Sequence, residues 1–462
     1  MSDWIEAELR ECQRHDARHT KRLARLLDRL SERPVGRMPT ACQGWAETIA
    51  ASRFLHNADM GVHEIVSGHT HATLERIRTQ EVGLLGPETT FLHDGTPQPK
   101  AGMGTVKIKT REAYRRHRTV ALTPERVNVG VSGMQRWQRP EEPVAYQRKR
   151  KPIAEKESDR WLEGPQDACK VKQACRAPLV VHMAAREGDI QEWLVDARRR
   201  ESHQRAEVII RATCHRRLAP GAAQRYVWAE MQQTPTLGTL TIALARQPER
   251  LPRPVTLAVT ATQGTFHGAR RPSGKLPPVE VSAVYAKELS PPQAEQPVEW
   301  LLLRRLPVRD FASACTVGQW YRCRWDIELF FRVLKQGCQL ERLRVQTEQR
   351  FLNALAMYVI VAWRLHNITM VGRAYPEVSC AIVFEPREWH TLYTMQHHSH
   401  PPPTPPPLRE MVRSLAPLGG FLARTKDGEP GMQAIWQGDQ RLHDFLYAIE
   451  LYRTINAVER NV

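Results

Sequence analysis

Acidic residues are scarce in this chain relative to its basic ones. The 462 residues include 67 Lys plus Arg but only 50 Asp plus Glu, which leaves a formal net charge of +17. An imbalance of this size favours a polyanionic partner, and nucleic acid is the commonest one. The length allows two or three domains and a sizeable core.

Long apolar runs and paired cysteines are missing as well. The longest strongly apolar run lies within residues 352–363 and stops at Arg364, which is too short to cross a bilayer. The first residues are charged from Asp3 onward and lack the apolar region of a signal peptide. The nine cysteines form no CxxC pair, which indicates free thiols in a reducing compartment. We therefore expect a soluble cytoplasmic protein with no membrane partner.

The first 75 residues show only helical patterns. Apolar side chains recur at three- and four-residue steps among arginines, as at Leu23, Leu26, Leu27 and Leu30. A small basic helical module ahead of a larger domain could read DNA, and it could equally be a packing appendage. We expect a helical DNA-binding domain over residues 1–75.

Strand patterns begin near residue 81. Apolar or alternating runs at 82–93, 105–109, 120–122 and 127–134 predict a meander. The continuous apolar run 178–183, a helical pattern over 186–200 and a strand pattern over 206–213 predict βα units. The fold class expected is therefore α/β, with a mixed sheet flanked by helices.

An insertion and a helical tail complete the predicted organisation. Residues 214–297 hold three alternating runs between proline-rich joints, which predicts an inserted β subdomain before the sheet resumes at 299–303. We expect one domain over 76–345, with that insertion, and a helical C-terminal region over 346–462. Helical apolar spacing in the tail is typical of a core or of a dimer face.

One stretch, from Tyr321 to Lys335, contains neither proline nor glycine and is predicted to be a single helix. Tyr321, Arg324, Glu328 and Lys335 fall at i, i+3, i+7 and i+14, so they share one face. That stripe could hold a metal ion with its Glu and phosphates with its cations. A solvated face with a Glu328–Arg324 or Glu328–Arg332 salt bridge is the simpler interpretation.

The same stretch, read as Tyr-x-x-Arg-x-x-x-Glu-x6-Lys, resembles the signature of bacterial insertion-sequence transposases of the DDE type. Further segments fall in the family's order and spacing: 3–4, 44–57, 88–90, 186–190, 300–303 and 418–421. The resemblance implies a ribonuclease-H-like fold with a β-strand insertion, an N-terminal DNA-binding part and a C-terminal dimer element. It also implies a reaction in which three carboxylates hold Mg²⁺ or Mn²⁺ for phosphodiester chemistry.

The resemblance also implies roles for individual residues. Arg324 and Lys335 would contact phosphates of the transposon end, Tyr321 would help to orient one, and Arg211 is a further candidate for DNA contact. Trp300 stands where the family uses an aromatic ring to hold a flipped base, although it could instead be a buried strand residue. The partners implied are double-stranded DNA, at transposon ends and target, and a second copy of the chain, with the protein at the bacterial nucleoid when bound.

The expected carboxylate set is incomplete. Glu328 is present, but Glu88 stands where the family has Asp, which places the carboxylate on the order of 1 Å too far for a site that tolerates about 0.5 Å. Ala185 occupies the other Asp position and has no ligand atom. Asp189 is expected to lie in the following helix and not to replace it. We therefore expect metal binding at Glu328 and Glu88 to be weakened and the chain to bind DNA but cut it poorly. A non-catalytic repressor or dominant-negative partner is the alternative.

Overall fold

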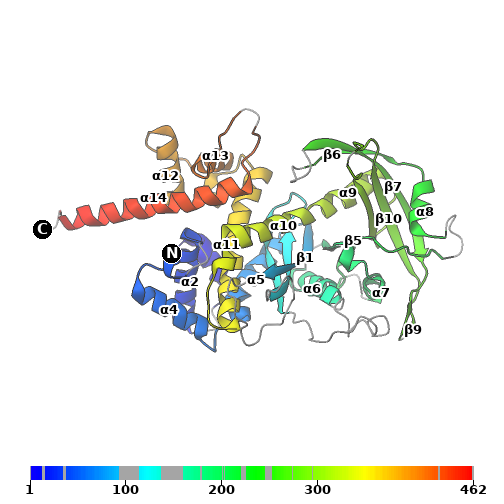
Figure 1. Cartoon of the computed structure of the whole chain (residues 1–462), viewed down its shortest axis with the longest axis horizontal. Coiled ribbons are helices and arrows are strands. Elements are labelled where there is room, and N and C mark those ends of the chain that lie inside the picture. Colours follow the sequence, from blue (N-terminus) through cyan, green and yellow to red (C-terminus); the bar gives the residue numbers. More distant parts are fainter. Residues whose placement is uncertain are drawn as a thin grey trace.

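The computed structural model describes residues 2–459 apart from 13–15, 35–37, 93–113, 137–159, 177–178, 200, 202, 220–224, 245–251, 273, 294 and 425–426. The strand expected at 105–109 lies outside the described residues. In the described part, a long sheet forms one side of the molecule and helices from both ends of the chain form the other (Figure 1).

The central feature is a nine-stranded mixed sheet in the order β3-β2-β1-β4-β5-β11-β10-β7-β6. Its strands are β1 (Val82–Leu92), β2 (Tyr114–Leu122), β3 (Asn128–Arg136), β4 (Leu179–Ala184), β5 (Glu207–Arg211), β6 (Gly238–Leu244), β7 (Arg253–Phe266), β10 (Val279–Glu288) and β11 (Glu299–Arg304). A separate ribbon pairs β8 (Arg270–Arg271) with β9 (Gly274–Lys275). The antiparallel meander β1–β3 and the parallel strands β4 and β5 confirm the predicted mixed sheet.

The insertion does not form a sheet of its own, contrary to the expected β subdomain. Strands β10, β7 and β6 continue the main sheet beyond β11, because β10 pairs with β11 over Ser282–Lys287. β11 itself pairs antiparallel with β5, from Leu302 opposite Arg211 to Arg304 opposite Ile209. β11 therefore has a hydrogen-bonded neighbour on each side, and neither of its edges is left unpaired.

Helices cover both faces of the sheet, and successive residues of β11 pack alternately on one face and on the other. Trp300 and Leu302 pack with α9 (Phe311–Arg322), α10 (Arg324–Arg332) and α11 (Glu348–Ala374). Leu301 and Leu303 pack on the other face with α7 (Gln191–Arg199) and α8 (Val227–Gln233), while α6 (Arg160–Cys175) covers β4 on that same side. Side chains of successive strand residues point to opposite faces, so a continuous apolar run is expected where helices cover both faces of the sheet.

The N-terminal helices pack on α11 and, through α5, directly on strand β3 of the sheet. They are α1 (Asp3–Leu9), α2 (Ala17–Glu32), α3 (Met38–Ala41), α4 (Trp45–His56) and α5 (Val62–Arg78). A buried network joins them to the sheet: Glu8 accepts from His69 Nδ1 at 2.5 Å and from Arg76 Nη1 at 2.6 Å. The Val131 amide of β3 donates to His69 Nε2 at 3.1 Å, which leaves the ring proton on Nδ1 for Glu8.

The helix α11 is the core of the assembly. It is the one helix of the described chain that is long and apolar enough to cross a membrane by length and composition, and 94% of its most apolar window is buried inside the protein. Thr347 caps its N-terminus by accepting from the Arg350 amide. Burial on this scale is typical of a helix at the centre of a globular core.

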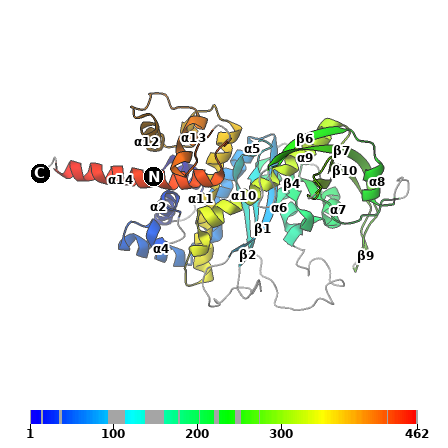
Figure 2. The same ribbon diagram turned by 45° about the horizontal axis from the view of Figure 1, so that its top comes forward.

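The C-terminal region continues with α12 (Pro386–His397), α13 (Leu408–Leu418) and α14 (Met432–Glu459). The proline-rich stretch before α13 is docked, since the Cys380 amide donates to Pro406 O and the Leu408 amide to Val378 O. The second half of α14 projects away from the body in both views (Figures 1 and 2). Its exposed side chains include Phe445, Ile449 and Tyr452.

Candidate active site

Glu88 lies in β1, an interior strand of the sheet. A close helix contact defines its surroundings: a Cβ atom added to Gly86 would lie 1.9 Å from Ile327 Cδ1, so a larger residue would displace the Ile327 side chain of α10. The β1–β4 ladder ends at Leu85 opposite His182, two residues before Pro87, which has no amide to donate. Helix α10 therefore rests on β1 beside Glu88.

Ala185 directly follows β4, the strand that pairs in parallel with β1, where Glu88 lies. The register ends with Leu85 opposite His182. Extended by three residues along each chain, it would set Glu88 level with Ala185. The backbone of Ala185 is still extended, with φ −71° and ψ −179°. Neighbouring strands are about 4.8 Å apart, so a carboxylate at residue 185 would stand beside that of Glu88. The methyl group of Ala185 supplies no ligand there.

The helix that carries the sequence signature is divided into three parts, which corrects the single helix predicted over Tyr321–Lys335. α9 begins at Phe311, where Asp310 Oδ1 accepts from the Ser313 amide at 2.8 Å, and it ends at Arg322. α10 follows after Cys323. A π turn over Val333–Gly337, closed by the bond from the Cys338 amide to Val333 O, then changes the direction of Lys335.

Arg324 joins the two carboxylates of the site. Its Nη1 donates to Glu88 Oε2 at 2.9 Å, and its Nη2 donates to Glu328 Oε1. The guanidinium side chain is 13% exposed, whereas Glu88 is 28% and Glu328 50% exposed. The predicted Glu328–Arg324 salt bridge is confirmed, and the same guanidinium also reaches a residue 236 positions away on the sheet.

Burial and the surrounding charges shift the pKa values of Glu88 and Arg324. Burial raises the pKa of Glu88 above its ordinary value; Arg324 opposes this rise, while Glu328 and Glu187 add to it. Burial lowers the pKa of Arg324, but Tyr321, Glu328 and Glu88 outweigh it and raise the pKa overall. The guanidinium is therefore the fixed cation between these carboxylates.

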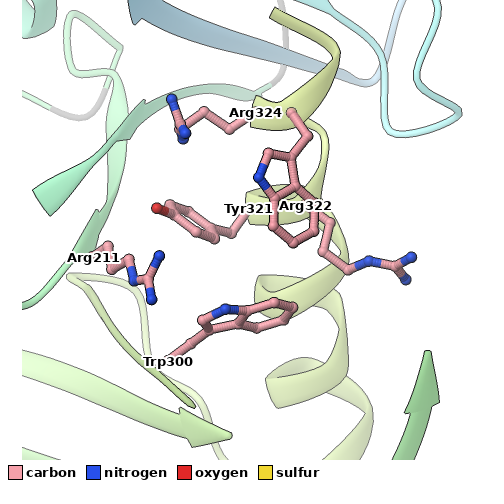
Figure 3. A pocket seen from close by; sticks show the side chains of 6 residues that line it. Arg211, Trp300, Tyr321, Arg322 and Arg324 are labelled. Atoms are coloured by element: carbon pink, nitrogen blue, oxygen red, sulfur yellow. The ribbon is translucent and has the colours of Figure 1, made fainter. Parts of the chain in front are cut away.

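A small hollow lies beside this pair, lined by Arg211, Trp300, Tyr321, Arg322, Arg324 and Trp325. Figure 3 shows Arg211 and Tyr321 directed toward each other across it, with Arg322 extending to the other side of the helix. The Arg211 guanidinium also donates to Glu299 O at 3.1 Å. Burial lowers the pKa of Arg211, although it remains a cation.

Trp300 is 4% exposed and contacts two aromatic rings, Tyr321 at 6.5 Å and Trp325 at 6.0 Å between centroids. It is therefore a buried strand residue whose ring also lines the hollow. Trp325 is 38% exposed and completes the aromatic wall. The exposed ring of Trp325 can stack on a base, and base stacking on aromatic side chains needs no sequence-specific contact.

Lys335 lies near Glu88 from the other end of the signature. Burial lowers its pKa, and Glu341 and Glu88 oppose that effect. The four signature residues thus surround Glu88 and the hollow, although a π turn separates Lys335 from the other three. Their common face is confirmed for Arg324 and Glu328 by the shared guanidinium contact.

Asp189 holds backbone and does not face the site as a ligand. Its side chain is 1% exposed and accepts from the Thr213 and Cys214 amides at 2.7 and 2.8 Å, and also from Arg216 Nη2. These donors occupy both carboxylate oxygens. The loop after β5 is thereby fixed to the start of α7, and Asp189 does not replace the missing carboxylate at residue 185.

Asp326 is likewise occupied elsewhere. Arg126 Nε and Nη2 each donate to it at 2.7 Å in a bidentate pair, and the carboxylate side chain is fully buried. This agrees with its predicted position off the Glu328 stripe. Among the described residues, no group of three His, Cys, Asp or Glu side chains could hold a metal ion.

The residues present do not fit the Mg²⁺ or Mn²⁺ site that the family resemblance implies. Mg²⁺ requires near-ideal octahedral oxygen ligation at about 2.0–2.1 Å. Of the three expected carboxylate positions, one is a methyl group and the other two are bridged by a guanidinium. The set can hold an anion through its cations more readily than a metal ion through its oxygens.

Several neighbours of the site were assigned no role from the sequence. Arg186 and Glu187, at the turn after Ala185, act electrostatically on Arg211 and Glu88 respectively, and Arg322 lines the hollow. The only signal for them was that they belong to the family-like segment 186–190 and to the stretch from Tyr321 to Lys335. The Arg126–Asp326 pair carried no local signal, since it joins residues 200 positions apart.

Three protein-family models match this chain. Residues 1–60 match a model described as Transposase DNA-binding, residues 189–364 match Transposase DDE domain, and residues 360–457 match Transposase Tn5 dimerisation domain. The DDE match includes Glu328, Arg211 and the hollow but begins beyond Glu88 and Ala185. The three matches follow the order expected from the sequence, with DNA binding first and dimerisation last.

Proposed function

This chain carries the DNA-binding, DDE and dimerisation domains of a DDE transposase, and from that premise we propose that it binds transposon ends as a dimer and cuts them poorly or not at all. In the family, strand cleavage, hairpin formation and strand transfer depend on divalent metal ions. We propose that the chain is of the type of the cut-and-paste transposase of the kanamycin-resistance composite transposon, which its signature resembles.

The observation that supports the impairment is that Glu88 and Ala185 follow the last pair of the β1–β4 ladder by the same three residues. Extension of this register sets the two residues level, and Ala185 carries only a methyl group. Glu88 keeps its charge, but its longer side chain reaches the Arg324 guanidinium. Misplacement of a reacting group by about 1 Å can cost about 100-fold in rate.

The basic and aromatic residues that we expect to contact DNA are all present, unlike the carboxylate set. Arg211, Tyr321 and Arg324 line the hollow with two tryptophans, and Lys335 lies close by. The net charge of +17 provides sequence-independent attraction to a duplex. These features support binding of a transposon end and do not depend on a complete carboxylate set.

The dimer is supported by α14. Phe445, Ile449 and Tyr452 fall at i, i+4 and i+7 and are 44%, 37% and 68% exposed, so they form an apolar stripe on a helix that projects from the body (Figure 2). The stripe lies inside the range that matches the dimerisation model. A second copy of the chain is the partner we propose for it.

A direct assay separates binding from cutting. The protein is mixed with a duplex carrying the terminal inverted repeat of its own element, and gel shift and strand cleavage are followed in the same samples with Mg²⁺ or Mn²⁺. We expect a shifted complex and little or no cleaved product. Robust cutting by the unaltered protein would overturn the proposal.

A second role, as a repressor or dominant-negative partner of an intact homologue, is favoured by the combination of an apolar α14 stripe with an incomplete carboxylate set. It is tested by adding this chain to a cutting-competent homologue. Cleavage should fall as the proportion of this chain rises, while an unchanged cleavage rate would exclude the role.

A further inference from the structure

The guanidinium of Arg324 lies where a cation is required between two carboxylates. It is held by Glu88 on the sheet and Glu328 on α10, one through Nη1 and the other through Nη2. Its side chain is only 13% exposed, so the cation is largely withdrawn from solvent. Arginine stays charged at any ordinary pH, and its forked donors suit two carboxylates at once.

The charges around this position are already balanced. Glu88 interacts electrostatically with Glu328 and Glu187, and Lys335 interacts with Glu88 and Glu341. Arg211 lies in the field of both Arg186 and Arg324. The cations of this neighbourhood (Arg186, Arg211, Arg324 and Lys335) equal its carboxylates in number, so a divalent ion would add uncompensated positive charge.

Entry of a metal ion would also have to break existing bonds. A bound ion must approach carboxylate oxygens to about 2.0–2.1 Å. One oxygen of each Glu, Glu88 Oε2 and Glu328 Oε1, already accepts a hydrogen bond from Arg324. A third carboxylate, which could bind the ion while Arg324 stays in place, is absent at Ala185. Asp189 has no oxygen to contribute, since three donors occupy it.

We propose that Arg324 is the built-in cation of this site, so that the site takes no divalent ion. The proposal concerns metal binding alone. Arg324 is a positioning residue for Glu88 and Glu328.

The metal claim is tested with Mn²⁺ alone, followed by the loss of its free electron paramagnetic resonance signal. We expect the unaltered protein to leave millimolar Mn²⁺ free and its melting temperature to be the same in Mn²⁺ and in EDTA. Saturable binding of Mn²⁺ at sub-millimolar concentration to the unaltered protein would overturn the proposal.

Substitution of Arg324 provides a second, independent test of the metal claim. Arg324→Gln removes the cation and leaves two facing carboxylates, and it should tighten Mn²⁺ binding by about 10-fold or more, equivalent to about 1.4 kcal/mol. Arg332→Gln, on the same helix and bonded only to Gln336 among the contacts seen, is the matched control and should change nothing. Folding of both variants is verified by circular dichroism. A folded Arg324→Gln protein with unchanged Mn²⁺ affinity would contradict the proposal.

Failure of the proposed function can be told apart with the inverted-repeat duplex in EDTA. Absence of a shifted complex there would defeat the proposed function and leave the Mn²⁺ results unchanged. Robust cleavage in Mg²⁺ would overturn both the proposed function and the metal claim.

Discussion

Glu88 of β1 and Ala185, directly after β4, each lie three residues beyond Leu85 and His182, the last pair of the parallel β1–β4 ladder. In the function that we propose, this sheet keeps the position of a ligand at residue 185 and lacks only its functional group. The guanidinium that bridges Glu88 and Glu328 completes a site whose charges are satisfied from within the chain. Substitution of single side chains can therefore test the role of each group in this site.

Asp189 should be critical for stability and not for metal chemistry. Asp189→Asn keeps the shape but leaves the Arg216 guanidinium, 9% exposed, without its charge partner. Breaking a buried pair in this way costs about 3–5 kcal/mol of unfolding free energy, measured by urea denaturation. Glu201→Gln, whose side chain is 74% exposed, is the control and should change little. Equal stability of Asp189→Asn and the unaltered protein would refute this role.

The stability of the C-terminal region should fall as pH rises above neutrality. Charges from Asp439 and Glu388 overcome the effect of burial and raise the pKa of His443 to about 9 from 6.5. Its nitrogens face Glu388 at 3.3 Å and Asp439 at 3.7 Å, with Arg364 also in the field. A folded pKa above the unfolded value means that the stabilisation is complete below about pH 6.5 and is lost as pH rises through about 9.

Asp439 reinforces this trend at lower pH. Burial raises its pKa to about 6 from 3.8, so its contribution is present below about pH 3.8 and is lost as pH rises through 6. Thermal unfolding across pH 6 to 9 should therefore show a falling melting temperature. The variant His443→Gln should lack the part of the fall above pH 6.5, and an identical pH profile for the two proteins would show that His443 is not its source.

The α14 stripe should control dimerisation. Ile449→Asp together with Tyr452→Asp places two charges among exposed apolar side chains, which prevents burial against a second copy without disturbing the monomer core. Sedimentation of the DNA complex should then show one protomer in place of two. Thr454→Asp lies on the other side of the same exposed helix, so it should leave the complex dimeric. Loss of the dimer in the Thr454 variant as well would mean that charge alone is responsible.

Arg211 should contribute one phosphate contact. Arg211→Gln removes a cation from the hollow, so end binding should weaken and the slope of log Kobs against log salt should fall by about 1. Arg409→Gln changes a 53% exposed arginine of α13 that pairs with Glu377, and the slope should stay the same. A reduced slope in both variants would indicate general charge loss and not a contact in the hollow.

The sequence predicted the sheet and the signature residues because both have local patterns. Apolar runs at two-residue and continuous spacing identified β4, β5 and β11, and three- and four-residue spacing identified α10. The continuation of the sheet from β11 into β10 was not predicted, since pairing between strands leaves no mark in either strand alone. The π turn before Cys338 and the start of α9 at Phe311 were missed for a related reason: caps and packing set helix ends.

Long-range electrostatics were equally hidden from the sequence. The Glu328–Arg324 bridge follows from i, i+4 spacing and was predicted, but the bond from Arg324 to Glu88 depends on α10 lying against Gly86 of β1. The buried Asp189–Arg216 pair likewise depends on the loop after β5. Family resemblance selected the candidate residues, and only the fold shows which of them touch.

The most direct measurement of the central claim compares the unaltered protein with the Glu88→Asp/Ala185→Asp double variant on the same inverted-repeat duplex in Mg²⁺ or Mn²⁺. The double variant supplies the missing carboxylate and shortens residue 88 away from the Arg324 guanidinium. If the lost carboxylates are the cause of the impairment, cleavage per bound complex should rise by about 100-fold or more while the affinity for the duplex stays the same. Equal cleavage by the two proteins, whether both cut or neither does, would contradict the account.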